Sequence, residues 1–501
     1  MLKSELEETI KKIALRKIKE YEKYHNYLEA EYQRNIKRGL PVPKKEVKTP
    51  AEWAIDKKHN PYYVLKHLKQ IANSIFNKIV EGSYKPFPPF IDEIEKKGSS
   101  KKRKIYKFQI PDEAMSNLIY SRLLSKNKHR FSSFSYAYRN DRNVHFAVKD
   151  IALDMKMSTR TFVAEFDFKD FFGSINHSYL IEQFDKNGFL ISDFERDIIL
   201  NFLGFMENDR GIPQGTSISL FLANLVCWKL DKKIEKEGLR FARYADDTII
   251  WADSYEKINK SFEIIDGFSK ETGVEVNLLK SDGISILAKK GIPTELNSRK
   301  HYLEFLGYQL SNDYTSIKNS SINKIKNHIS EILYKNLIKP LNQPRLKSVR
   351  IPANNQDRDL LVAIIQIRRY LYGNLNDKLL RNYLSGDYKR LKFKGLMSFY
   401  PLIDDEEQLK NLDKWLISTI LNALKKRRKL LLKHGHNRKH NFPFNVDAQG
   451  LIEVCKKSKI NGIKGLMEIP SFLRIYHAIK QNVITVGIER TMHFNSSKYN
   501  Y

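Results

Sequence analysis

The stretch Phe241-Ala242-Arg243-Tyr244-Ala245-Asp246-Asp247-Thr248-Ile249-Ile250-Trp251 decides the fold. Apolar, β-prone residues on both sides of a two-residue break predict a β-hairpin. The turn carries two adjacent carboxylates, and like charges a few ångströms apart repel each other. Two divalent ions would relieve that repulsion, and hard oxygen ligands suit Mg²⁺. A lone Asp-Asp pair is more often a solvated turn, but Tyr-Ala-Asp-Asp between two hydrophobic strands is a more specific pattern.

A third carboxylate follows another predicted strand. Residues 161–167 (Thr-Phe-Val-Ala-Glu-Phe-Asp) alternate in character between polar neighbours, which predicts a strand ending at Asp167. On a strand beside the hairpin tip, Asp167 would complete a set of three carboxylates. Three hard oxygen ligands on adjacent strands are the set that phosphoryl transfer requires.

Three segments resemble the palm of reverse transcriptases. Residues 166–172 (Phe-Asp-Phe-Lys-Asp-Phe-Phe) resemble the first catalytic motif of that family. Residues 211–217 (Gly-Ile-Pro-Gln-Gly-Thr-Ser) resemble its Pro-Gln-Gly motif, and residues 244–247 resemble its second catalytic motif. Each match alone is only a hypothesis, but their common order and spacing make chance agreement a poor explanation.

The resemblance implies a metal site with Asp167, Asp246 and Asp247 as catalytic ligands. The backbone at Phe168 would complete the site, which would hold two Mg²⁺ ions, with Mn²⁺ as a substitute.

The resemblance also implies a nucleotide site. Asp170 and Phe171 would cradle the triphosphate, and Gln214 would orient the nucleotide. Phe172, five residues beyond Asp167, would exclude the ribose 2′-OH, so that the product is DNA; one of the two adjacent phenylalanines would be core and the other the gate. Lys280 would lie near the leaving pyrophosphate, although a surface lysine is the simpler interpretation. Further phosphate contacts are expected from two basic residues of the fingers, Arg103 and Lys104.

Three further segments are candidate nucleic-acid contacts. Ser135-Tyr136-Ala137-Tyr138-Arg139 resembles a segment of the fingers of retron and group II intron enzymes, and Arg139 is its candidate phosphate contact. Phe305-Leu306-Gly307-Tyr308 resembles the primer grip, a short hairpin that holds the primer 3′ end. The third is the basic run Lys425, Lys426, Arg427 and Arg428, where an RNA-binding thumb surface and a solvated helix face are equally good interpretations.

Composition favours a polyanionic partner. The 501 residues carry a net charge of +30 with a pI near 9.7, and Lys and Arg bind phosphates by releasing counterions. The sequence contains no run of 18 apolar residues, so we expect no membrane span. The Lys/Glu-rich N-terminus lacks the apolar core of a signal peptide. The two cysteines, Cys227 and Cys455, have no metal-like spacing, so we expect a cytoplasmic, reducing location.

The expected fold class is α+β, with a ferredoxin-like palm and fingers between helical regions. We expect a helical N-terminal extension (1–59), fingers and palm (60–310), and a helical thumb and C-terminal domain (311–501). The N-terminal helix should span 1–38 and stop at Gly39, and a capping box at Thr49–Glu52 should begin the next. A third helix should run over 61–81, and a charged hairpin tip should lie at 95–103. Apolar periodicity predicts further helices over 112–125, 144–155, 217–230, 255–270, 357–372 and 404–432.

The resemblance implies an RNA-directed DNA polymerase that makes cDNA from dNTPs on an RNA template. It is most like the defence-associated "unknown group" enzymes, which implies a structured noncoding RNA as template and a role against phage. An untemplated nucleotidyltransferase, an RNA-dependent RNA polymerase and a noncatalytic RNA scaffold remain as alternatives, and so does a retron- or intron-derived role. The primer (RNA, DNA or a protein hydroxyl) and a homo-oligomer are left open.

Overall fold

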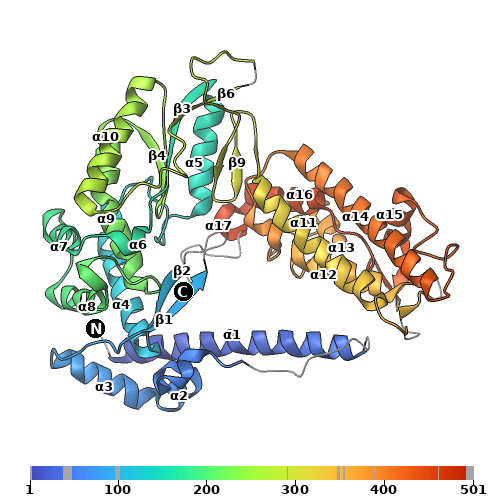
Figure 1. Ribbon diagram of the computed structural model, residues 1–501, viewed down its shortest axis with the longest axis horizontal. Helices are drawn as coiled ribbons and strands as arrows, with labels where there is room; N and C mark the ends of the chain where they lie inside the picture. The colour runs from blue at the N-terminus through green and yellow to red at the C-terminus, as the bar shows by residue number, and fades with distance from the viewer. Residues whose placement is uncertain are drawn as a thin grey trace.

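The computed structural model describes residues 3–37, 48–95, 102–289, 291–346, 350–353, 356–388, 390–460 and 462–491. It has the expected α+β fold (Figure 1). The predicted helix stop at Gly39 and most of the predicted hairpin tip at 95–103 lie outside the described residues.

A five-stranded sheet carries the candidate site, in the order β4-β5-β3-β6-β7. Neighbouring strands are antiparallel except β6 and β7, which are parallel. The strands are β3 (Arg160–Phe166), β4 (Arg240–Tyr244), β5 (Asp247–Ala252), β6 (Ile284–Ala288) and β7 (Arg299–Lys300). The predicted strand over 161–167 and the predicted hairpin are therefore confirmed.

Alternate residues of this sheet enter two different hydrophobic cores. Phe162 and Ile250 belong to one core, whereas Val163 and Trp251 belong to the other. Side chains on a strand point alternately to opposite faces, so both faces are covered. Helices α9 (Ser217–Lys236) and α10 (Tyr255–Thr272) pack on the first face, and α5 (Val144–Met157) contacts β4 from the second core.

The first core continues into the N-terminal part of the chain. Helix α1 (Lys3–Lys37) buries Leu6, Ile10 and Ile13 and packs against α4 (Ile110–Asn127). The predicted helix over 61–81 is divided at His67 into α2 (Pro61–Lys66) and α3 (Leu68–Val80). The capping box was wrong, because residues 51–54 form a single 3-10 turn with no side-chain cap.

The strands β1 (Phe90–Glu95) and β2 (Lys102–Lys107) form a two-stranded antiparallel hairpin, called the small hairpin below (Figure 1). Short helices follow β3, namely α6 (Phe171–Ser174), α7 (His177–Lys186) and α8 (Asp193–Leu203). Single 3-10 turns cover Lys57–His59, Lys128–Arg130 and Glu207–Asp209.

The C-terminal region is helical, as expected, and shares the second core with the sheet. A small antiparallel sheet of β8 (Leu303–Phe305), β9 (Tyr308–Leu310) and β10 (Thr315–Ile317) precedes its helices. Its helices are α11 (Asn319–Leu333), α12 (Arg358–Tyr372), α13 (Asp377–Leu384), α14 (Glu406–Lys433), α15 (Ala448–Lys457), α16 (Phe472–Val486) and α17 (Ile488–Thr491). Minor elements are the π-helix Tyr334–Ile338, the 3-10 turns Lys339–Leu341 and Leu396–Phe399, and the strand pair β11 (Lys459–Ile460) and β12 (Ile463–Lys464).

Within the described ranges, no helix combines the length and apolarity that crossing a membrane requires.

Candidate active site

The strand order brings the three predicted carboxylates to one edge of the sheet. Phe166, the last residue of β3, pairs with Thr248 of β5, so Asp167 follows beside the hairpin tip. Tyr244 pairs with Asp247, so the two-residue loop consists of Ala245 and Asp246. Asp247 therefore begins β5 instead of lying in the turn, one position away from the expectation.

The buried side chain of Arg243 stabilises this turn by a hydrogen bond to its backbone. Ala245 has φ of +62°, a left-handed conformation that costs about 1–2 kcal/mol for a residue other than glycine. Its carbonyl accepts a hydrogen bond of 3.1 Å from Nη1 of Arg243. The same guanidinium forms an ion pair of 2.6 Å with Asp231, and both side chains are 1% exposed. The turn is thus fixed by a buried pair that the sequence pattern did not single out.

Burial and mutual repulsion act on the carboxylates of the hairpin. Burial raises the pKa of Asp246, and the charge of Asp167 adds to that rise. Burial, followed by the charges of Asp246 and Asp167, raises the pKa of Asp247 to about 6. A bound cation would reverse these shifts, because an opposite charge favours the ionised carboxylate.

The segment 275–281 fixes Asp167. The amide of Asn277 donates to the Asp167 carbonyl at 2.8 Å, and its side-chain amide donates to Oδ2 of Asp167 at 2.8 Å. The Asp167 amide in turn donates to Oγ of Ser281 at 3.2 Å. Lys280 Nζ lies 3.1 Å from the same Oδ2. Of these contacts only Lys280 was predicted; Asn277 and Ser281 are its close neighbours in sequence but were not singled out.

These residues fit a divalent cation by their chemistry. Three carboxylates supply hard oxygen donors, and the ammonium of Lys280 already occupies a cationic position against Asp167. In the part of the chain that the structure describes, no three His, Cys, Asp or Glu side chains form a ready-made ion site. The backbone at Phe168 is held by a bridge to Val276, and its side chain is buried.

The segment 211–215 joins the residues after Asp167 to the small hairpin. The amide of Ile212 donates to the Phe172 carbonyl at 2.7 Å, and the Tyr106 amide of β2 donates to the Gln214 carbonyl at 2.8 Å. Gly215 has φ of +115°, and an added Cβ would lie 3.0 Å from the Tyr106 carbonyl oxygen. The close approach of β2 therefore requires glycine at this position.

The two adjacent phenylalanines have different surroundings. Phe171 is 2% exposed and belongs to the core, whereas Phe172 is only partly buried at the edge of that core. The ring of Phe172 lies 6.4 Å from the ring of Tyr138. Of the two, Phe172 is the residue whose side chain could meet a nucleotide, while Phe171 could contribute only its backbone.

The small hairpin brings basic residues to the same edge. Arg103 and Lys104 are exposed on β2, and the charge of Arg103 lowers the pKa of Asp246. The charge of Asp170 raises the pKa of Tyr106 on this strand, so Asp170 lies near β2. Asp170 has φ of +43°, and a side chain at Gly173 would collide with its carboxylate.

The predicted hairpin at 305–308 is present and lies near Asp247. Leu306 and Gly307 form its two-residue turn with φ of +50° and +86°, the signs that type I′ turns require. The amide of Lys318 donates to the Gly307 carbonyl at 3.0 Å. The charge of Lys318 lowers the pKa of Asp247, so Lys318 belongs to the site although the sequence pattern did not single it out. Phe305 and Tyr308 are buried.

Arg139 is a correction to the expected phosphate contacts. It is 4% exposed, and its guanidinium donates to Asp141 and to the carbonyls of Ser132, Ser135 and Lys128. A guanidinium whose donors are used inside the protein holds loop structure and is not presented to a phosphate.

Arg427 is a second correction. It is 0% exposed and forms ion pairs of 2.8 Å with Asp357 and 3.2 Å with Asp359. Lys425 and Lys426 are exposed on the same helix, and Arg428 is half-buried. The basic run is therefore interrupted, because one of its four residues belongs to the core of the C-terminal region.

Residues 94–310 match the family described as reverse transcriptase (RNA-dependent DNA polymerase). The retron Ec86 reverse transcriptase of Escherichia coli is 29% identical over 196 residues, which are 38% of this chain and 56% of that protein. The group II intron-encoded protein LtrA of Lactococcus lactis subsp. cremoris is 30% identical over 184 residues, 35% of this chain and 30% of that protein. The chain thus spans about half the length of the first relative and less than a third of the second.

Among solved structures, apo telomerase from Candida tropicalis is similar with a TM-score of 0.36 and 12% identity, over 77% of this chain and 72% of that one. Candida tropicalis telomerase in complex with a fragment of telomeric RNA has a TM-score of 0.36 and 13% identity, over 85% of this chain and 63% of that one.

Proposed function

We propose that this chain, whose residues 94–310 form a reverse transcriptase domain, is an RNA-directed DNA polymerase. One observation carries the proposal: Asp167 follows β3 directly beside the hairpin tip that bears Asp246 and Asp247. That placement supports a shared site for divalent cations, within the segment that matches the family.

The residues would divide the work of nucleotidyl transfer. Bound divalent ions would activate the primer 3′-hydroxyl and stabilise the leaving pyrophosphate. Asp167, Asp246 and Asp247 would hold them, with Asn277 fixing the Asp167 carboxylate. Lys280 would exchange its ion pair with Asp167 for the phosphates of the nucleotide.

The remaining contacts would bind the nucleotide and the primer. Arg103 and Lys104 would bind the triphosphate from β2, and Gln214 would orient the nucleotide from the segment that is hydrogen-bonded to that strand. Phe172 would select deoxyribose, and the turn at Leu306 and Gly307 would support the primer end.

The test is dNTP incorporation on an RNA template with a DNA primer, in Mg²⁺ and in Mn²⁺. Asp246→Asn with Asp247→Asn should abolish incorporation while the melting temperature is kept, since both carboxylates are ligands in this proposal. Omitting the template tests the untemplated transferase, and supplying only ribonucleotides tests the RNA polymerase. Incorporation by the folded double variant would overturn the metal-site assignment.

The biological role is a separate proposal that rests on resemblance to defence-associated enzymes. The chain would copy a structured noncoding RNA into cDNA that protects against phage. Sequencing nucleic acid that copurifies with the protein should recover one RNA and its complementary DNA. Phage plating should drop with the wild-type gene and recover with the double variant; equal plating would remove the defence role while leaving polymerisation untouched.

A further inference from the structure

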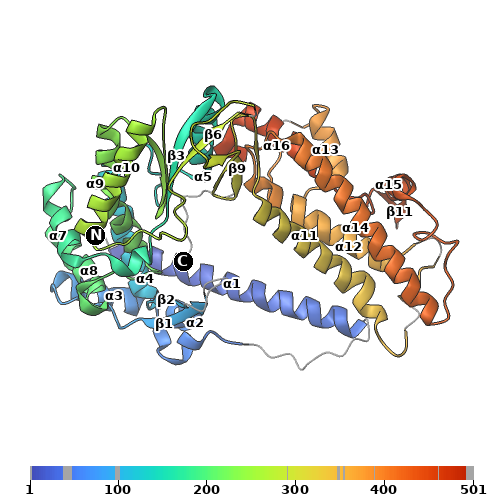
Figure 2. The same ribbon diagram turned by 45° about the horizontal axis from the view of Figure 1, so that its top comes forward.

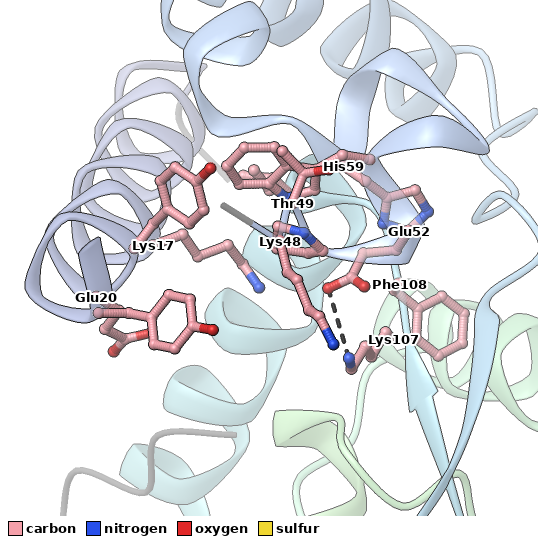
Figure 3. A pocket seen from close by; sticks show the side chains of 13 residues that line it. Lys17, Glu20, Lys48, Thr49, Glu52, His59, Lys107 and Phe108 are labelled. Carbon is pink, nitrogen blue, oxygen red and sulfur yellow. Dashed lines mark hydrogen bonds and ion pairs between the residues drawn. The ribbon is translucent and has the colours of Figure 1, made fainter. Parts of the chain in front are cut away.

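A pocket of about 410 Å³ lies between α1, residues 48–53 and the strand β2 (Figure 3). Its volume falls in the range of small-molecule sites. It is distinct from the carboxylate edge, because none of the carboxylates or candidate nucleotide contacts described above lines it.

One wall of this pocket is aromatic. Tyr21, Tyr24 and Trp53 line it together with Phe108. The rings of Tyr21 and Trp53 pack 4.9 Å apart, while Tyr24 keeps 43% of its surface exposed. Aromatic side chains on an accessible wall are suited to stacking on a flat ring.

Three lysines also line the pocket. Lys17 comes from α1, Lys48 precedes the 3-10 turn, and Lys107 ends β2; their amines point into the same opening (Figure 3). Lys17 pairs with Glu113 at 2.9 Å, and Lys107 pairs with Asp92 at 2.8 Å. Two carboxylates, Glu20 and Glu52, line the pocket as well, and Glu52 pairs with Lys107 at 3.5 Å (Figure 3). The three amines outnumber these carboxylates, which favours an anionic group such as a phosphate.

A buried polar atom at the wall lacks a partner. His59 is 4% exposed, and its Nε2 has no hydrogen-bond partner among the described residues. Burial lowers the pKa of His59, so the ring is neutral at pH 7 and carries one donor and one acceptor nitrogen. Buried polar groups in native proteins are nearly always satisfied, so the atom is available to a ligand.

We propose that this pocket binds a nucleotide, with the base against Trp53 and Tyr24, the phosphate on the lysines, and His59 donating to or accepting from the base or sugar. A free nucleotide and an unpaired nucleotide of a bound RNA share this chemistry. The proposal does not depend on polymerisation, since the pocket uses none of the catalytic residues.

Equilibrium dialysis in EDTA would test the proposal with two probes, a set of four labelled nucleoside 5′-monophosphates and single-stranded RNA hexamers. EDTA suppresses metal-dependent binding at the carboxylates. Trp53→Leu, Tyr24→Ala and Lys48→Gln are the variants; Lys17 and Lys107 are avoided because each pairs with a carboxylate, so replacing it would also leave that carboxylate without its partner. Lys23→Gln is the matched control, since Lys23 is an exposed lysine of α1 that does not line the pocket.

Trp53→Leu and Tyr24→Ala should each weaken binding roughly tenfold, within the range measured for one stacked base. Lys48→Gln should weaken it through the lost charge, and Lys23→Gln should not. Monophosphate binding with this dependence identifies a free-nucleotide site, and hexamer binding alone identifies a nucleotide of RNA as the occupant. Tyr24→Ala alters an exposed ring, so it tests the pocket even if Trp53→Leu fails to fold. The proposal is overturned if folded variants bind both probes like the control, or if inorganic phosphate competes as well as the nucleotide.

Discussion

At the scale of single residues, Arg243 shows how a buried charge positions the site. Its guanidinium pairs with Asp231 and holds the carbonyl of Ala245. Removing one partner of a buried pair leaves an uncompensated charge, which costs about 3–5 kcal/mol. Arg243→Gln should therefore lower the free energy of unfolding by about that amount and reduce incorporation. Arg240 lies on the same strand β4 and forms a partly exposed pair with Asp154 of α5, so Arg240→Gln should cost about 0–1 kcal/mol. Equal losses in urea unfolding would contradict this.

Sugar selection also belongs to a single residue. Phe172→Val should open space beside the incoming sugar and raise the ratio of ribonucleotide to deoxyribonucleotide incorporation. Phe171→Val removes part of a core ring that is 2% exposed, so it should lower stability without changing this ratio. Competition assays with both nucleotides measure the ratio. If only Phe171→Val changes the ratio, the residue that excludes ribose is Phe171 and not Phe172. If neither variant changes the ratio, neither phenylalanine selects the sugar.

His145 on α5 should make stability depend on pH. Burial lowers its pKa to about 4, compared with about 6.5 in an unfolded chain. Between these values the unfolded chain binds more protons, so stability is full above about pH 6.5 and falls as the pH drops toward 4. The loss approaches roughly 3 kcal/mol. His145→Phe should flatten urea unfolding curves collected across this range, whereas the exposed His129→Gln should not.

At the scale of elements, the local sequence pattern predicted which helices and strands exist better than it predicted where they end or which of their side chains are buried. The apolar spacing of α1, α5 and α10 and the alternation in β3 to β5 were readable because each depends on its own residues. The burial of Arg427 could not be predicted from the local sequence, because its partner Asp357 lies 70 positions away and only tertiary packing brings them together. Arg139 was misread for a related reason, since three of its acceptors are backbone carbonyls.

Helix α14 carries the buried Arg427 and the exposed Lys425 and Lys426. A structural role and a role in RNA binding can therefore be tested separately on this helix. Lys425 and Lys426 are exposed, so Lys425→Gln with Lys426→Gln should weaken RNA binding without changing the melting temperature. For every phosphate that the variant no longer binds, the slope of log affinity against log salt should become shallower by roughly 0.7–0.9. The control is Lys410→Gln with Lys414→Gln, two exposed lysines nearer the start of the same helix. If the salt slope changes equally in the variant and in the control, the basic run contributes only general charge and is not a specific RNA contact. Arg427→Leu should instead unfold the C-terminal region.

At the scale of the whole molecule, α1 connects two distant regions. Its first half packs on α4, and its last turns reach the C-terminal helices (Figures 1 and 2). A 35-residue helix is about 50 Å long, so one part of it can contact α4 while its end contacts the C-terminal region. Tyr27 and Glu31 of α1 line one pocket with His328 and Lys335 of the C-terminal region, so the last turns of α1 meet the C-terminal region there.

Because α1 and the C-terminal region meet at this pocket, we expect the protein to form a closed ring around bound nucleic acid. Glu31→Cys with Lys335→Cys places two thiols on the walls of one pocket, and both native cysteines are buried. A bifunctional maleimide added after an RNA–DNA duplex with capped ends should trap it, giving a complex that survives 1 M salt. The same reagent added first should block loading. Replacing Glu31 alone is the control, because a single thiol cannot close the ring. Loss of the duplex in high salt from a fully cross-linked complex would show that α1 lies beside the nucleic-acid path and does not close over it.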